Sequence, residues 1–161
     1  MRRIIVMSDS HGKTKAFENI CKMNPEAERY VFLGDGAGDY EYIQSHHEDW
    51  AMIGVSGNCD RFTNLPEVQE LIVGEWRFLL AHGHKFAIKA TYQYILDEAR
   101  KRNCNAVLYG HTHSAYCDKI DGIWVLNPGA IMDYRGPRYA VLDLDDGGVF
   151  IANLTTYTNN D

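Results

Sequence analysis

The sequence predicts an α/β (α+β) fold, a four-layer αββα sandwich in which two mixed β-sheets face each other and helices cover their outer sides. Three observations carry this prediction. Strand-like and helix-like segments alternate in the first third of the chain, apolar runs paired across tight turns dominate the rest, and 161 residues suit one compact core. We therefore expect a single domain over residues 1–161.

The first third alternates between apolar runs and segments of helical period. Strands are expected at Arg3–Ser8, Arg29–Leu33 and Trp50–Ser56, and helices at Thr14–Met23 and Asp39–His47. The first helix carries its apolar residues on one face. Because each strand is followed by a helix and then another strand, the crossovers should be right-handed and the sheet parallel.

The remainder of the chain is expected to be largely antiparallel. Three pairs of apolar runs flank short turns and predict hairpins: Val68–Val73 with Trp76–Ala81, Tyr116–Ile120 with Ile123–Leu126, and Arg138–Leu144 with Val149–Thr155. The Asp121-Gly122 turn is a strong type I′ signal. Between the first two hairpins, Lys89–Asn103 predicts an amphipathic helix and Ala106–Tyr109 a short buried strand.

Composition excludes several functional classes. Sixteen basic residues against 22 acidic ones give a formal net charge of −6, which argues against strong nucleic-acid binding through a basic surface. No apolar run approaches the roughly 20 residues of a membrane helix, and Ile4–Met7 is too short for the core of a signal peptide. The four cysteines form no C-x-x-C pair, so reduced thiols and a cytoplasmic location are expected.

Polar residues follow five of the expected strands, mostly with glycine beside them. The segments are Ser8-Asp9-Ser10-His11, Gly34-Asp35, Ser56-Gly57-Asn58-Cys59-Asp60, His82-Gly83-His84 and Gly110-His111-Thr112-His113. Ligands of open α/β sheets bind beyond the carboxyl ends of the strands. The five segments are therefore expected to converge on one site.

The residue types at this site indicate divalent metal ions. Carboxylate and imidazole ligands together suit manganese, iron, zinc or nickel, and no set of thiolates is present. Seven candidate ligands exceed what one ion takes, so two ions about 3.5–4 Å apart are expected. On an extended backbone, Asp9 and His11 would point the same way, as would His111 and His113. The candidates are Asp9, His11, Asp35, Asn58, His82, His111 and His113.

This ordered set of motifs resembles the calcineurin-like metallophosphoesterases. The small size, Gly57-Asn58-Cys59-Asp60, Gly110-His111-Thr112-His113 and Asn127-Pro128-Gly129 make the chain most similar to the small YfcE-like bacterial and archaeal phosphodiesterases. The resemblance runs from Arg3 to about Gly129 and also implies the metallophosphoesterase fold. Any one motif is weak alone, but five in this order are specific.

The resemblance implies a role for each matching residue. Asp9, His11 and His113 would hold one metal ion, Asn58, His82 and His111 the other, and Asp35 would bridge both. A hydroxide bridging the two ions would attack phosphorus in line and hydrolyse a small phosphodiester. Manganese is the first expectation for the metal. Catalytic roles then attach to Asp35, Asn58, His82 and His111.

Cys59 departs from the wider family, in which a histidine proposed as the general acid follows the Gly-Asn pair. A thiol with a pKa near 8.5 is a poor proton donor in its place. The YfcE-like subgroup shares this cysteine, so activity is still expected. Acidic leaving groups should be favoured, because they depart without a proton.

Taken singly, several of these residues have simpler interpretations. Asp9 alone fits an N-cap of the Thr14–Met23 helix, Asp35 fits a turn, and His82 and His111 fit histidines satisfied within the core. The complete set favours metal ligation.

Other polar residues near the motifs remain open. His84 would contact substrate, support a ligand or cap its loop, and Cys59 fits a small buried filler better than a catalytic group. Asp60 would orient a ligand or pair with Arg61. Four basic residues would contact phosphate or carry solvated charge: Arg61, Lys85, Arg135 and Arg138.

Two other functions stay open besides phosphodiester hydrolysis. Some relatives on this fold, such as the retromer subunit, are interaction scaffolds with degraded sites, whereas all seven ligand positions here carry competent side chains. A phosphomonoesterase is the second alternative, and the missing histidine at Cys59 leans away from it. No membrane partner is expected, and pairing of edge strands would give a homo-oligomer.

Overall fold

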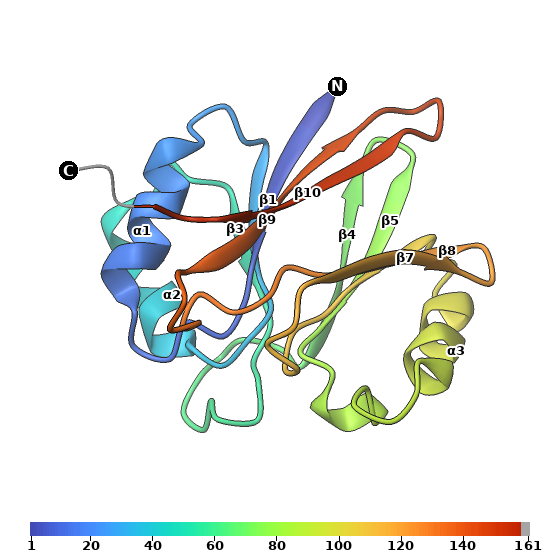
Figure 1. The fold of residues 1–161 in the computed structure, drawn as a ribbon, viewed down its shortest axis with the longest axis horizontal. Coiled ribbons are helices and arrows are strands. Elements are labelled where there is room, and N and C mark those ends of the chain that lie inside the picture. The colour runs from blue at the N-terminus through green and yellow to red at the C-terminus, as the bar shows by residue number, and fades with distance from the viewer. Residues whose placement is uncertain (159–161) are drawn as a thin grey trace.

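The computed structural model describes residues 1–158, and within them ten strands form two five-stranded sheets (Figure 1). The first sheet has the order β10 (Phe150–Thr156), β9 (Arg138–Leu144), β1 (Arg2–Met7), β2 (Arg29–Phe32) and β3 (Met52–Gly54). The second has the order β4 (Val68–Val73), β5 (Trp76–Ala81), β6 (Ala106–Leu108), β8 (Ile123–Asn127) and β7 (Tyr116–Ile120). The expected pair of mixed sheets is confirmed.

Each sheet contains three parallel strands, which form one side of the first sheet and the centre of the second. β1, β2 and β3 run parallel, and so do β5, β6 and β8, while β4 and β7 are antiparallel edges of the second sheet. The three expected hairpins are all antiparallel, so the expectation that the second half is largely antiparallel is confirmed, and only the short strand β6 adds parallel pairs. β6 separates the two hairpins and inserts between β5 and β8, so hairpin turns alone do not describe the sheet.

The last hairpin belongs to the first sheet. β9 pairs with β1 along the edge opposite β2. Arg3 on β1 faces Asp143 on β9, and Arg3 Nε donates to Asp143 Oδ1 at 2.8 Å. The C-terminal strands thus complete the sheet that the N-terminal strands begin, which brings the two ends of the described chain together in one layer.

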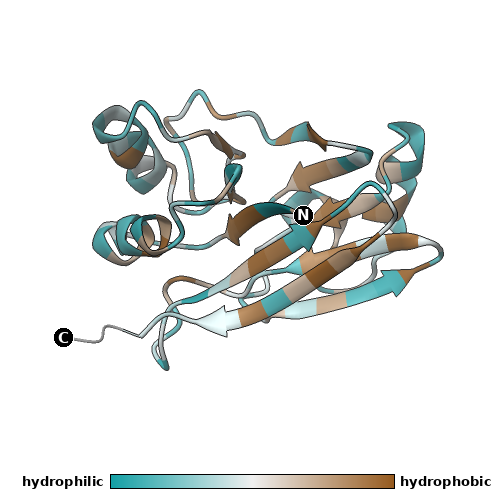
Figure 2. Cartoon of the chain, turned by 90° about the horizontal axis from the view of Figure 1, so that it is seen from above, coloured by the Kyte–Doolittle hydropathy of each residue, from teal (hydrophilic) through white to brown (hydrophobic). Residues whose placement is uncertain are grey.

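Three apolar clusters hold the four layers together. Along β1, Ile4 and Val6 face the core between the two sheets, whereas Ile5 and Met7 pack under α1 (Thr14–Met23) and α2 (Ala37–His46). Leu79 of β5 packs instead with Ile95 of α3 (Gln93–Lys101) on the outer side of the second sheet. The central strands are mostly apolar in Figure 2, as burial on both faces requires.

The largest differences from the predicted boundaries occur in α2, β3 and α3. α2 begins at Ala37, two residues early, and β3 is limited to the three residues that pair with β2. α3 begins only at Gln93, because Ala90 and Thr91 N–H groups both donate to the Ala87 carbonyl in a turn. A short 3-10 helix at His84–Phe86 (η1) was not expected.

Candidate metal centre

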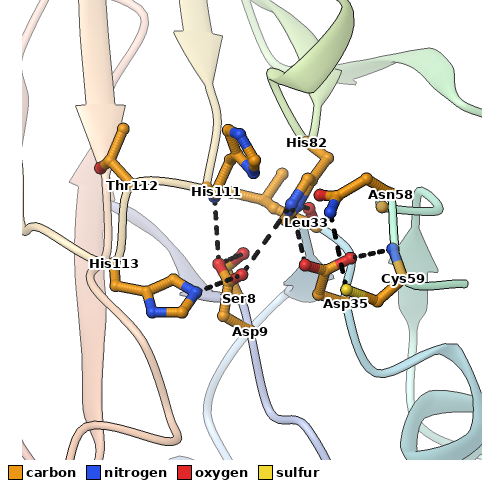
Figure 3. A network of polar contacts seen from close by, with 12 residues as sticks. Ser8, Asp9, Leu33, Asp35, Asn58, Cys59, His82, His111, Thr112 and His113 are labelled. Atoms are coloured by element: carbon orange, nitrogen blue, oxygen red, sulfur yellow. Dashed lines mark hydrogen bonds and ion pairs between the residues drawn. The ribbon is translucent and has the colours of Figure 1, made fainter. Parts of the chain in front are cut away.

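Four strands, two from each sheet, deliver polar side chains to one end of the sandwich (Figure 3). Asp9 and Asp35 follow β1 and β2, while His82 and His111 follow β5 and β6. Asp35 Oδ2 lies 3.2 Å from His82 Nε2, and Asp9 Oδ2 accepts the His111 backbone N–H at 3.1 Å. We call the connected set the strand-end cluster: Asp9, His11, Asp35, His82, His111 and His113.

The seventh candidate ligand, Asn58, reaches the cluster through its neighbour. Asn58 Nδ2 lies 3.5 Å from Cys59 Sγ, and the Cys59 backbone N–H donates to Asp35 Oδ1 at 2.8 Å (Figure 3). Cys59 Sγ also lies within 4.8 Å of donor atoms of His11 and Asp35. The segment after β3 therefore borders the cluster on its exposed side.

The backbone at these residues is left-handed rather than extended. The φ angles are 54° at Asp9, 41° at His11, 59° at Asp35, 68° at His111 and 61° at His113. The expected strand-like alternation is therefore wrong, since the strands end before the motifs begin. Non-glycine residues rarely adopt this region, and such conformations cluster at functional sites where the surrounding structure holds them.

Asp9 lies at the centre of the histidines. Its Oδ2 atom accepts hydrogen bonds from Ser8 Oγ at 2.6 Å and from the His111 N–H. Its Oδ1 atom lies 3.1 Å from His113 Nε2 and 3.6 Å from His11 Nε2. One oxygen is thus occupied by donors of the chain, and the other is left facing imidazoles.

Asp35 and His82 form a buried pair of acceptors. His82 Nδ1 lies 2.7 Å from the Leu33 carbonyl, so it carries the proton there. The opposite ring atom, Nε2, is fully buried and has no hydrogen-bond donor among the described residues. In the neutral ring its lone pair points at Asp35 Oδ2. Either a proton on Nε2 or a cation bound by both atoms must therefore offset the two facing lone pairs.

The electrostatics agree with this geometry. Burial alone would raise the pKa of Asp35, but the interaction with the His82 ring and the hydrogen bond from the Cys59 N–H outweigh it and hold that pKa well below its usual range. Burial alone would lower the pKa of His82, but Asp35 and Asp9 outweigh it and raise that pKa. Burial and the neighbouring His82 lower the pKa of His111, so His111 stays neutral and keeps a lone pair for a metal.

Asp60 fixes the loop that carries Asp35. Its two carboxylate oxygens accept four backbone N–H groups, those of Asp35 and Gly57 at 2.8 Å, Ala37 at 2.9 Å and Gly36 at 3.0 Å. Of the two roles considered from the sequence, Asp60 therefore orients a candidate ligand. Because these contacts join loops that follow β2 and β3, they hold the two strand ends in register.

Two residues that support the cluster, Asp39 and Ser8, were not predicted from the sequence. Asp39 accepts hydrogen bonds from Ser10 Oγ at 2.6 Å, the Gly12 N–H at 2.9 Å and Thr14 Oγ1 at 2.5 Å, and so shapes the loop around His11. Ser8 holds Asp9, as described above. The only signal for Asp39 was a carboxylate in the first turn of a helix, which is common without any such role.

Asn127 supports the loop that carries His111 and His113. Its Nδ2 donates to the Gly110 carbonyl at 3.0 Å and to Thr112 Oγ1 at 2.9 Å. At Gly110 a Cβ atom would lie 2.0 Å from Ser8 Oγ, so the loop needs glycine there to approach β1. Asn127, the residue before Pro128, thus holds the histidine loop in place.

Cys59 and His84 lie at the edge of the cluster. Cys59 is exposed, so its interpretation as a buried filler is wrong. His84 is half-buried, its ring centre is 5.5 Å from that of His82, and its Nδ1 has no hydrogen-bond partner among residues 1–158. Burial and the proximity of His82 lower the pKa of His84, which keeps the ring neutral.

The four basic candidates differ in how free their charges are. Lys85 pairs with Glu67 and Arg135 with Asp133. Arg61 is exposed, and Arg138 is half-buried with an Nε atom that has no partner in the described part of the chain.

The alternative role of Asp9 as the N-cap of α1 is wrong. The helix begins after Lys13, and no side chain caps its first turn.

None of the described helices is both long enough and apolar enough to cross a bilayer.

Comparison with known proteins identifies consistent relatives. A family model described as the calcineurin-like phosphoesterase superfamily domain matches residues 1–147. A probable metallophosphoesterase of Mycoplasma pneumoniae is 30% identical over 169 residues and the alignment covers all of both chains. The phosphodiesterase YfcE of Escherichia coli is 27% identical over 95% of this chain and 94% of its own.

Solved structures of similar fold include a predicted phosphoesterase and Vps29 proteins. A predicted phosphoesterase from Streptococcus pneumoniae superposes with a TM-score of 0.84 at 27% identity and covers 96% of this chain and 89% of its own. Vps29 of Entamoeba histolytica, in complex with Zn²⁺, superposes with a TM-score of 0.69 at 17% identity over 96% of this chain and 98% of its own. Similarity at that level of identity shows the shared fold alone.

Proposed function

The chain belongs to the calcineurin-like phosphoesterase superfamily, and on that premise we propose that it hydrolyses small phosphodiesters with two divalent metal ions bound at the strand-end cluster. One observation carries the proposal. His82 Nε2 and Asp35 Oδ2 face each other at 3.2 Å, fully buried or nearly so, with the His82 proton committed to the Leu33 carbonyl. A divalent cation satisfies both acceptors at once.

We assign the ligands from two groups of residues, and within each group the donor atoms lie within 4.8 Å of one another. Asp9, His11 and His113 form the group for one ion, and Asp35, His82 and His111 form the group for the other. We assign Asn58 to the second ion and Asp35 as the ligand shared by both. When bound, the ions would supply a hydroxide for in-line attack on phosphorus and would offset the negative charge that develops there.

The residues of the chain keep these ligands in place. The Leu33 carbonyl fixes the tautomer of His82, so that Nε2 faces the site. Ser8 and the His111 N–H orient Asp9, while Asp60 orients the Asp35 loop. Because these contacts already fix the side chains, a carboxylate or imidazole loses less conformational entropy when it binds a cation.

Cys59 sets the expected range of substrates. Partial desolvation by the neighbouring loops and the charge of Asp35 raise the pKa of its thiol, so it stays protonated at neutral pH but is too weak an acid to assist a leaving group. We therefore propose that diesters with acidic leaving groups are cleaved fastest. Activity on monoesters should be lower.

The identity and setting of the metal are part of the proposal. Carboxylate and imidazole donors without a required thiolate favour manganese, with iron, zinc or nickel as substitutes.

The four cysteines are free thiols, which fits a reducing compartment. We therefore place the protein in the cytoplasm, as one domain of residues 1–161. Its last three residues lie outside the described part of the chain.

The test is removal of metal with a chelator and separate addition of manganese, zinc, iron or nickel. We expect metal-dependent cleavage of bis(p-nitrophenyl) phosphate that exceeds cleavage of p-nitrophenyl phosphate under the same conditions. A preference for the monoester would replace the proposal by phosphomonoesterase activity. Metal binding without turnover of either ester would favour an interaction scaffold.

A further inference from the structure

A cavity of about 330 Å³ adjoins the strand-end cluster at His113. It lies between residues 112–114 and residues 132–135. The second wall is tied to the cluster, because the N–H groups of Ile131 and Met132 donate to the carbonyls of Ser8 and Asp9 at 3.0 and 3.1 Å. The cavity is therefore fixed relative to the residues proposed to hold the ions.

The wall formed by residues 132–135 offers an aromatic face without free charge. Tyr134 is 94% exposed. Arg135 lies 5.7 Å from the centre of the Tyr134 ring, and its Nε and Nη2 atoms donate to the two carboxylate oxygens of Asp133 at 3.1 and 2.9 Å. The guanidinium is thus ion-paired with Asp133 and held over the Tyr134 ring. Such a wall selects for a planar uncharged group over a second phosphate.

We propose that this cavity takes one ester arm of the diester substrate, that this arm is a planar aromatic group, and that Tyr134 is the specificity-determining residue on which it stacks. The inference rests on the proposed function, because it places the scissile phosphate at the strand-end cluster beside His113. The volume is at the small end of the range for ligand sites and suits one ring system.

The first test compares two diesters that share a leaving group. Tyr134→Ala should lower kcat/KM for bis(p-nitrophenyl) phosphate about three- to tenfold, mainly through KM, with the manganese-loaded protein. With methyl p-nitrophenyl phosphate, an unchanged kcat/KM would place the stacked arm on the side that stays with phosphorus. An equal loss would place it on the leaving side, and both results support the proposal.

The matched control is Tyr94→Ala, because Tyr94 is also an exposed tyrosine, at 56%, but belongs to α3 and does not line the cavity. Tyr134→Phe should retain the wild-type values, since the ring and not the hydroxyl carries the contact. Wild-type kinetics of Tyr134→Ala on both diesters would overturn the proposal.

A binding measurement separates this inference from the proposed function. Calorimetry of the metal-loaded protein with phenylphosphonate and methylphosphonate requires no turnover. We expect phenylphosphonate to bind about three- to tenfold more tightly, and Tyr134→Ala to abolish the difference. Equal binding of both phosphonates by the wild type would reject the aromatic subsite. Preferential binding of phenylphosphonate without turnover of any diester would reject the proposed function and keep the subsite.

Discussion

The buried centre of the candidate site and its exposed rim are built in different ways. The side chains of Asp9 and His82 are fully buried and that of Asp35 is 4% exposed, whereas those of His11 and His113 are 27% and 42% exposed. In the centre, each carboxylate has at least one oxygen held by a donor of the chain. We call the exposed residues, His11, His113 and Cys59, the rim, and their side chains have fewer hydrogen bonds from the chain. We propose that the buried centre orients the metal ligands, whereas the exposed rim adds His11 and His113 as ligands and faces the substrate, and four predictions test this division.

The largest effect is expected from Asp35→Asn in the centre. This change removes the charge of the shared ligand and places a donor opposite His82 Nε2. We expect the rate of diester cleavage to fall by about three orders of magnitude or more, since metal ions contribute several kcal/mol to the transition state. Steady-state kinetics give the rate, and circular dichroism checks that the variant is folded. Turnover near the wild-type value would rule out the shared ligand.

The support of the centre is tested by Asp60→Asn. In the variant an amide NH2 group replaces one carboxylate oxygen and cannot accept hydrogen bonds from the backbone N–H groups. The Asp35 loop therefore loses some of the hydrogen bonds that hold it. Metal affinity should fall about 10- to 100-fold, as for other residues that orient a ligand. Calorimetric titration with Mn²⁺ measures this change. Asp118→Asn on exposed β7 is the control, and equal affinities of the two variants would show that Asp60 has no such role.

The metal affinity should also depend on pH. The pKa of His82 is raised above its ordinary value near 6.5 when no cation is bound, so a proton competes with the metal below that raised pKa. As pH falls through this range, affinity for Mn²⁺ should drop about tenfold per pH unit for each proton displaced. Titrations in buffers of different protonation enthalpy count these protons. An affinity that is constant between pH 8 and pH 5 would contradict the proposed role of His82.

The smallest effect is expected at the rim. Cys59→His introduces an acid of suitable pKa next to Asp35 and should raise cleavage of diesters with poor leaving groups several-fold, up to about tenfold. Diesters of p-nitrophenol should change less, because their leaving group needs no proton. The comparison is made at saturating metal. Identical changes for both kinds of diester would show that position 59 does not face the leaving oxygen.

Much of the fold follows from local patterns. The apolar runs that predict β1 and β2 succeed because both faces of these strands are buried, and the Asp121-Gly122 turn forms the β7–β8 hairpin as expected. The placement of β9 and β10 in the first sheet was not predicted. It depends on the free edge of β1 and on contacts such as Arg3 with Asp143, which lie 140 residues apart.

The site was predicted as a set of residue types rather than as a geometry. The ordered motifs identified the family, and the structure brings six of the candidate ligands together. The left-handed backbone at Asp9 and His111 was not predicted, because glycine is the only residue type that adopts such conformations routinely. The exposure of Cys59 and the role of Asp39 depend on loops that meet only in the folded chain.

The most direct test is a crystal structure of the manganese-loaded protein with anomalous scattering recorded at the manganese edge. The account predicts two peaks about 3.5–4 Å apart, with Asp35 between them and His82 Nε2 on one of them. A single peak, or two peaks that do not both contact Asp35, would contradict the shared-ligand centre on which the proposed reaction depends.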